Sequence, residues 1–179
     1  MTKTDNQNNV KQAMTEVASP VLDGYDLVAY HSLRSGQDGV RGSDQHTAHY
    51  KGYEFWFTSA ENKALFEQNP EKYLPAYGGF CVWGVANERK PEWPWSRTHM
   101  GPPCGPSDGW HVDNGKLYCA FNKRFINMFF ENAAINIPRA DKRWSEWFED
   151  LTAGPLNNRC YPWTKQECRD GGQIQNRAN

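Results

Sequence analysis

The chain has 179 residues, a length typical of one domain of ordinary size. Its 20 Lys and Arg residues are balanced by 21 Asp and Glu residues, and the formal net charge of −1 argues against binding to nucleic acid or to an anionic membrane. The mean hydropathy is −0.86, and no apolar run approaches the ~18 residues of a membrane-spanning helix, which excludes a span. Aromatic residues still make up 14% of the chain, which indicates a folded domain with an aromatic core.

The ends of the chain differ in composition from its middle. Residues 1–20 are polar and lack the apolar centre of a signal peptide, so we expect a flexible arm on a protein that is either cytoplasmic or exported after removal of a leader. Residues 21–153 are expected to form the domain and residues 154–179 a loop-like tail. The five Cys residues form no Cys-x-x-Cys motif, and no internal repeat is visible.

The first half of the chain is predicted to contain a β-hairpin. Residues 25–30 read as a short strand or a buried run. The strand candidates 46–50 and 53–57 are joined by the turn signal Lys51-Gly52.

Two helical segments are expected directly after the hairpin. Ser59 is a good N-cap for a helix over 60–68, which Asn69-Pro70 would end. A second short helical turn is predicted over 70–74.

In the second half, a strand over 80–86 is expected to follow a glycine turn, and residues 87–110 read as a long loop. A further strand is predicted over 116–121, with helices over 122–132 and 140–151. The fold class is therefore α+β, with one small antiparallel sheet of four or five strands and helices packed on it. The expected core consists of aromatic and aliphatic residues from these elements: Tyr25, Val28, Phe55, Phe57, Leu65, Phe66, Tyr73, Phe80, Val82, Leu117, Phe121, Trp144 and Trp147.

Five sequence segments occur in an order that resembles the longer branch of the YHS-domain proteins. They are GYDLVAY (24–30), HYKGYEFWFTSAENKALFEQNPEKY (49–73), YGGFCVWGVA (77–86), DNGKLYCAFN (113–122) and ADKRW (140–144). The resemblance implies a YHS-like core with a C-terminal helical extension. The short YHS modules are regarded as metal-associated, whereas the role of the longer branch is poorly defined.

The metal-associated cysteines of that family are absent from the matching positions. Those positions hold Ala29, Thr58 and Asn62, none of which is a soft thiolate ligand for zinc or copper(I). A metal site in this chain would therefore lie elsewhere.

The remaining Cys, His and Met residues suggest where such a site would form. Together with the resemblance, they lead to the hypothesis of a non-enzymatic metal-binding module that takes copper, or else zinc. Cys81 and Cys119 lie in predicted strands that we expect to be neighbours, so they could form a disulfide or a two-thiolate metal site. The candidate metal ligands are Cys81, His99, Met100, Cys104, His111 and Cys119.

Purely structural roles for the other His and Cys residues remain alternatives to this hypothesis. His31 reads as a surface histidine, and His46 and His49 would point to opposite faces of a strand. Cys160 and Cys168 would close a disulfide in an oxidising compartment.

Two other classes of function are also considered. A module that binds a small molecule or a protein without metal would use the Trp-rich 87–110 loop, where Trp93 and Trp95 form either an aromatic platform or a lid folded on the core. A Cys-dependent enzyme is the weaker alternative, because spacing supplies neither an oriented base nor an oxyanion hole.

Overall fold

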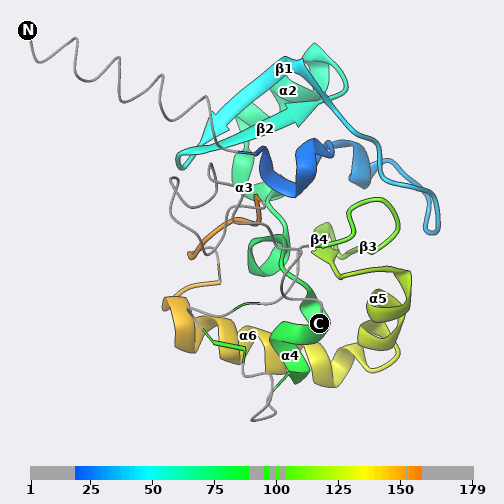
Figure 1. Ribbon diagram of the computed structural model, residues 1–179, viewed down its shortest axis with the longest axis vertical. Coiled ribbons are helices and arrows are strands. Elements are labelled where there is room, and N and C mark those ends of the chain that lie inside the picture. The colour runs from blue at the N-terminus through cyan, green and yellow to red at the C-terminus, as the bar shows by residue number, and fades with distance from the viewer. Residues whose placement is uncertain (1–18, 89–94, 97–99, 101–103, 152, 159–179) are drawn as a thin grey trace, which may run out of the picture.

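The computed structural model describes residues 19–88, 95, 96, 100, 104–151 and 153–158. The fold is α+β, as predicted, but the described strands form two separate two-stranded antiparallel sheets instead of one sheet of four or five strands (Figure 1). No described helix is both long and apolar enough to cross a membrane.

The first group of elements, residues 21–73, contains the predicted hairpin and helices. The turn residues Lys51 and Gly52 have φ values of 50° and 80°, as a tight hairpin requires. Ser59 caps the following helix by accepting a hydrogen bond from the N–H of Asn62 at 3.2 Å. The elements are η1 (Val21–Gly24), η2 (Ala29–His31), β1 (Ser43–Tyr50), β2 (Tyr53–Phe57), α2 (Ala60–Gln68) and α3 (Pro70–Tyr73).

The second group of elements, residues 76–148, repeats that order. Its hairpin turn, Asn114-Gly115, again has positive φ values, and Asn122 caps α5 through the N–H of Phe125 at 3.2 Å. The elements are η3 (Ala76–Gly79), α4 (Val82–Asn87), β3 (Trp110–Asp113), β4 (Lys116–Cys119), α5 (Lys123–Phe130) and α6 (Ala133–Phe148).

The two hairpins have the same register at a fixed spacing of 63 positions. Tyr50 pairs with Tyr53 in the first hairpin, and Asp113 pairs with Lys116 in the second. Each of the three remaining β3–β4 pairs also equals a β1–β2 pair shifted by 63 positions. The side chains at equivalent positions are mostly dissimilar. The structure therefore repeats a tight hairpin followed by a capped helix at this spacing, whereas the turns η1 and η3, which begin at Val21 and Ala76, are 55 positions apart.

The left-handed turns that open the two groups are joined by one residue. Asn157 donates its backbone N–H to the carbonyl of Gly78 at 2.8 Å and its side-chain amide to that of Gly79 at 3.1 Å. Its own carbonyl accepts the N–H of Leu22 at 2.8 Å. The start of the expected tail is thus docked against the domain through a buried Asn157.

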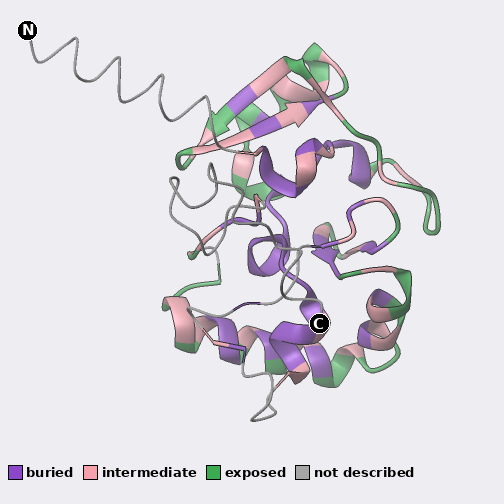
Figure 2. Cartoon of the chain, in the orientation of Figure 1, coloured by how far each residue is buried: buried purple, intermediate pink, exposed green. Residues whose placement is uncertain are grey.

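Two hydrophobic cores lie on the two faces of the β3–β4 hairpin. Leu117 and Cys119 pack into the core formed with β2 and α2, whereas Tyr118 and Ala120 pack into the core formed with α4, α5 and α6. Figure 2 draws the buried residues of these elements in purple. Alternation along a strand places successive side chains on opposite faces, so this hairpin contributes to both cores.

Several predicted elements are corrected by the structure. Residues 80–86 were expected to form a strand, but Val82–Asn87 is the helix α4. Because this short apolar run is buried on every side, its sequence has no period that separates strand from helix. The run at 25–30 is buried but forms a turn and η2, with only Tyr25 bridged to Arg41.

Two predicted core residues are exposed. Leu65 is 43% exposed and Phe121 47% exposed, because Phe66 and Ala120 take the inward positions beside them. Tyr25 and Trp147 are only partly buried against the cores.

Candidate functional site

The thiols of three candidate metal ligands interact electrostatically with one another: Cys81, Cys104 and Cys119. Among the described residues, no group of three or more His, Cys, Asp or Glu side chains is placed to hold a metal ion. Met100 is buried in the core that contains Cys81, His111 lies in β3, and His99 falls outside the described residues.

Two of the thiols are in contact. Cys104 and Cys119 are buried in the same core, where the two thiols interact, and the Cys104 Sγ lies 3.9 Å from the carbonyl oxygen of Gly109. Burial, followed by the contact with Cys119, raises the pKa of the Cys104 thiol well above its usual value. The structure has Cys104 and Cys119 as free thiols.

Cys81 belongs to the other core and is also a free thiol. Because it precedes α4 and lies in no strand, the expected cross-strand pairing with Cys119 lacks its structural basis. Burial raises the pKa of the Cys81 thiol, and hydrogen bonds from the backbone N–H groups of Gly84 and Phe121 oppose this only in part.

In the first group of elements, the position equivalent to Cys81 is occupied by the carboxylate of Asp26. Asp26 follows η1 as Cys81 follows η3, and it is completely buried. It accepts hydrogen bonds from the N–H groups of Val28 and Ala29, and from the backbone and side chain of Thr58.

Asn62 completes this cluster by donating its side-chain amide to Asp26 at 2.7 Å. Ala29, through its backbone N–H, and Thr58 and Asn62, through their side chains, thus all bind one carboxylate. That carboxylate is already hydrogen-bonded through both oxygens, so the cluster holds the chain together and offers no open position for an ion.

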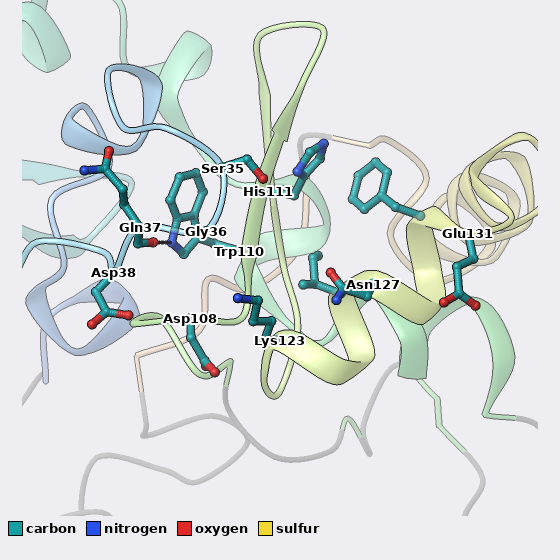
Figure 3. Close-up of a pocket in the computed structure, with 12 residues that line it drawn as sticks. Ser35, Gly36, Gln37, Asp38, Asp108, Trp110, His111, Lys123, Asn127 and Glu131 are labelled. Atoms are coloured by element: carbon teal, nitrogen blue, oxygen red, sulfur yellow. Dashed lines mark hydrogen bonds between the residues drawn. The ribbon is translucent and has the colours of Figure 1, made fainter.

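A cavity with a volume of about 560 Å³ lies between the 35–38 loop, β3 and α5 (Figure 3). The side chains of Trp110, His111, Ile126 and Phe130 provide its apolar wall. The residues that line the cavity are Ser35, Gly36, Gln37, Asp38, Asp108, Trp110, His111, Lys123, Ile126, Asn127, Phe130 and Glu131.

The loop side of this pocket is held in place by hydrogen bonds. The indole N–H of Trp110 donates to the carbonyl of Gln37 at 3.0 Å, shown as the dashed line in Figure 3. The N–H of Gly39 donates to the carbonyl of Ser107 at 2.7 Å. Tyr30 packs on Trp110 with ring centroids 5.0 Å apart. The pocket wall is therefore fixed before any ligand arrives.

The helix side of the pocket presents a row of polar side chains. Lys123, Asn127 and Glu131 are spaced four residues apart at and just beyond α5, so they share one face. The ring of Phe130, beside them, lies 4.2 Å from that of His111. This spacing was visible in the sequence, but nothing there indicated that the 35–38 loop would face it.

The tryptophans of the 87–110 segment do not form one platform in the described part of the chain. Trp95 is 6% exposed and packs over Gly84, where an added Cβ would overlap its ring. This agrees with the lid interpretation for Trp95, while Trp93 lies outside the described residues. Trp110 alone from this segment lines the pocket.

The other histidines have separate surroundings. His49 pairs with Glu54 at 3.5 Å, and His46 lies in the irregular part of β1. His31 is half-buried with its ring edge against Tyr73, and its Nε2 is buried without a hydrogen-bond partner among the described residues. The Cys160 and Cys168 pair lies outside the described residues.

Comparison with known proteins adds no further information on the site. No family model, no curated protein and no solved structure matches the chain.

Proposed function

We propose that this chain is a non-enzymatic binding module that takes a small polar molecule in the pocket between the 35–38 loop, β3 and α5. The observation that carries the proposal is a cavity of about 560 Å³, within the ~300–1,000 Å³ range of small-molecule sites. It joins a small apolar wall to a majority of polar and charged side chains, which suits a polar ligand. The proposal keeps the small-molecule hypothesis but moves the site from the 87–110 loop to the cavity beside it.

A filled pocket tests this function. We expect Asn127→Trp to block the cavity, because Asn127 is exposed on the pocket face of α5. Arg124→Trp is the matched control, since it places the same ring on the same helix outside the pocket lining. Benzamidine, benzyl alcohol and benzoate serve as probes of equal shape and different charge.

Nuclear magnetic resonance would follow the indole N–H signal of Trp110 while each probe is added at millimolar concentration. At least one probe should shift this signal in the unchanged protein and in Arg124→Trp, and leave it unmoved in Asn127→Trp. If no probe moves the signal, or if Asn127→Trp responds like the control, the pocket does not bind small molecules and the proposal fails.

A second candidate function is copper(I) binding by Cys104 and Cys119. The observation that favours it is the contact between these two buried thiols. Thiolates select copper(I), which a pair of them can hold, and the resemblance to the YHS-domain proteins supports a metal. Zinc fits poorly, because structural zinc takes four ligands and the described residues offer no such group.

Copper content of the intact protein separates this candidate from the first. Native mass spectrometry after copper(I) loading should give one ion per chain, lost in Cys104→Ser or Cys119→Ser. Cys81→Ser tests whether the nearby third thiol is needed; if Cys104 and Cys119 alone hold the ion, this variant should keep it. Equal loss in all three variants, or no bound copper in the unchanged protein, contradicts the assignment.

A further inference from the structure

The charges around the pocket are unequal. Three carboxylates, Asp38, Asp108 and Glu131, line it together with one ammonium group, Lys123. Within the described part of the chain, none of these four side chains has an ion-pair or hydrogen-bond partner. The excess negative charge is therefore not neutralised by the protein.

Resting on the proposed binding function, we infer that the ligand of this pocket is a small organic cation, an ammonium or amidinium group carried on a flat apolar body. A cation gains from the uncompensated carboxylates, whereas an anion is repelled by them. The half-buried ring of Phe130 favours the same charge, because the face of a Phe ring attracts cations.

The carboxylates lie at both ends of the cavity. In Figure 3, Asp38 and Asp108 lie on the Trp110 side, and Glu131 lies on the opposite side, beyond Asn127. A cationic group can therefore approach a carboxylate at either end while its apolar body covers the wall. The flat face of the ligand would lie against Phe130 and His111, whose rings are 4.2 Å apart.

Lys123 opposes this preference without reversing it. It is exposed at the first turn of α5, and a Lys side chain has four rotatable carbons that let its charge move into solvent. Removing its charge should strengthen the binding of a cation, which gives the inference a test in the opposite direction to loss of a carboxylate.

Dissociation constants for the three probes named above test the ligand class. Benzamidine, a cation, should bind about tenfold more tightly than neutral benzyl alcohol, and benzoate should bind most weakly. Each of Asp38→Asn, Asp108→Asn and Glu131→Gln should weaken benzamidine by about threefold, as expected for exposed charges, and Lys123→Gln should strengthen it. Added salt should reduce the preference.

Glu67→Gln is the matched control, because Glu67 is an exposed acid on α2 outside the pocket lining. It should leave the affinity for benzamidine unchanged. The cation inference fails if benzoate or benzyl alcohol binds at least as tightly as benzamidine. If Asn127→Trp abolishes that binding, the proposed pocket function still stands. If no probe responds to Asn127→Trp, both fail.

Discussion

The carboxylate of Asp26 joins three segments of the first half of the chain. It is buried completely and accepts hydrogen bonds from the residues that follow it, from Thr58 after β2, and from Asn62 in α2. A carboxylate suits this place because both of its oxygens only accept, and every neighbouring group is a donor.

Replacing this acid by its amide should destabilise the protein. In Asp26→Asn, one acceptor oxygen becomes an NH₂ group that faces donors, and the charge that strengthens the remaining bonds is lost. We expect the free energy of unfolding to fall by about 2–4 kcal/mol, as measured by urea denaturation. Asp44→Asn, an exposed site in β1, should change it by less than about 0.5 kcal/mol, and an equal effect at both sites would contradict this account.

His31 should make the stability depend on pH. Burial, and then the nearby charges of Lys72 and Lys116, lower its pKa below the ordinary value of 6.5, so the folded protein favours the neutral ring. The unfolded chain then binds more protons than the folded one as the pH falls below about 6.5, and stability is lost in that range.

Comparing melting temperatures of the unchanged protein and His31→Phe between pH 5 and pH 8 would measure this effect. The variant keeps a ring against Tyr73 but cannot be protonated. It should lose less stability on acidification than the unchanged protein. Identical pH profiles would show that His31 carries no such penalty.

At the scale of single elements, turn and capping residues in the sequence correctly predicted the features that depend on neighbouring residues. The Lys51-Gly52 turn and the Ser59 cap were identified because their backbone geometry depends on adjacent residues. The predicted strand at 80–86 failed because the helix there is decided by surrounding contacts. The beginning of α6 at Ala133 was missed because Pro138, which lies inside the helix, reads as a boundary.

The pocket lies beyond what such signals can predict. Its walls come from a loop near residue 36, from β3 and from a helix that begins at Lys123, and the hydrogen bond from Trp110 to Gln37 joins the loop to β3. Contacts between segments so distant in sequence depend on the whole fold. The candidate metal ligands also come from segments distant in sequence, and His99 lies outside the described residues, so the metal site stays a prediction.

The buried Arg143 of α6 holds the end of α4. Its guanidinium donates to the carbonyls of Gly84 and Val85 in that helix, and to those of Glu88 and Trp95 beyond it. Carbonyl groups at a helix C-terminus lack intrahelical partners, and here a planar fork of donors supplies them.

Arg143→Lys should therefore destabilise the protein by about 2–3 kcal/mol, because an ammonium group cannot reach all four carbonyls. Chemical denaturation would measure the change. Arg139→Lys on the same helix contacts only Asn87 among the described residues and should cost much less. Similar costs at the two sites would show that the carbonyl contacts contribute little.

At the scale of the whole molecule, the β3–β4 hairpin makes the two cores interdependent. Leu117 is fully buried in one core while its neighbour Tyr118 packs in the other. Loss of packing on either face should therefore be felt on both sides of the hairpin.

Leu117→Ala should lower the free energy of unfolding by about 2–5 kcal/mol through the lost burial and the cavity left behind. Hydrogen exchange followed by mass spectrometry should show α2 and α6 losing protection together, although Leu117 contacts only the first core. Faster exchange confined to α2 would mean that the cores unfold independently.

The 63-residue spacing gives the molecule a second hairpin followed by a capped helix, without the polar side chains of the proposed pocket. Shifted by that spacing, Lys123, Asn127 and Glu131 correspond to Ala60, Ala64 and Gln68 of α2, none of which is charged. A hairpin followed by a capped helix therefore occurs twice, once with two charged side chains in the row on the helix and once with none. Protein engineers could transplant the polar row onto α2 and learn, within one chain, how much of recognition comes from side chains and how much from backbone.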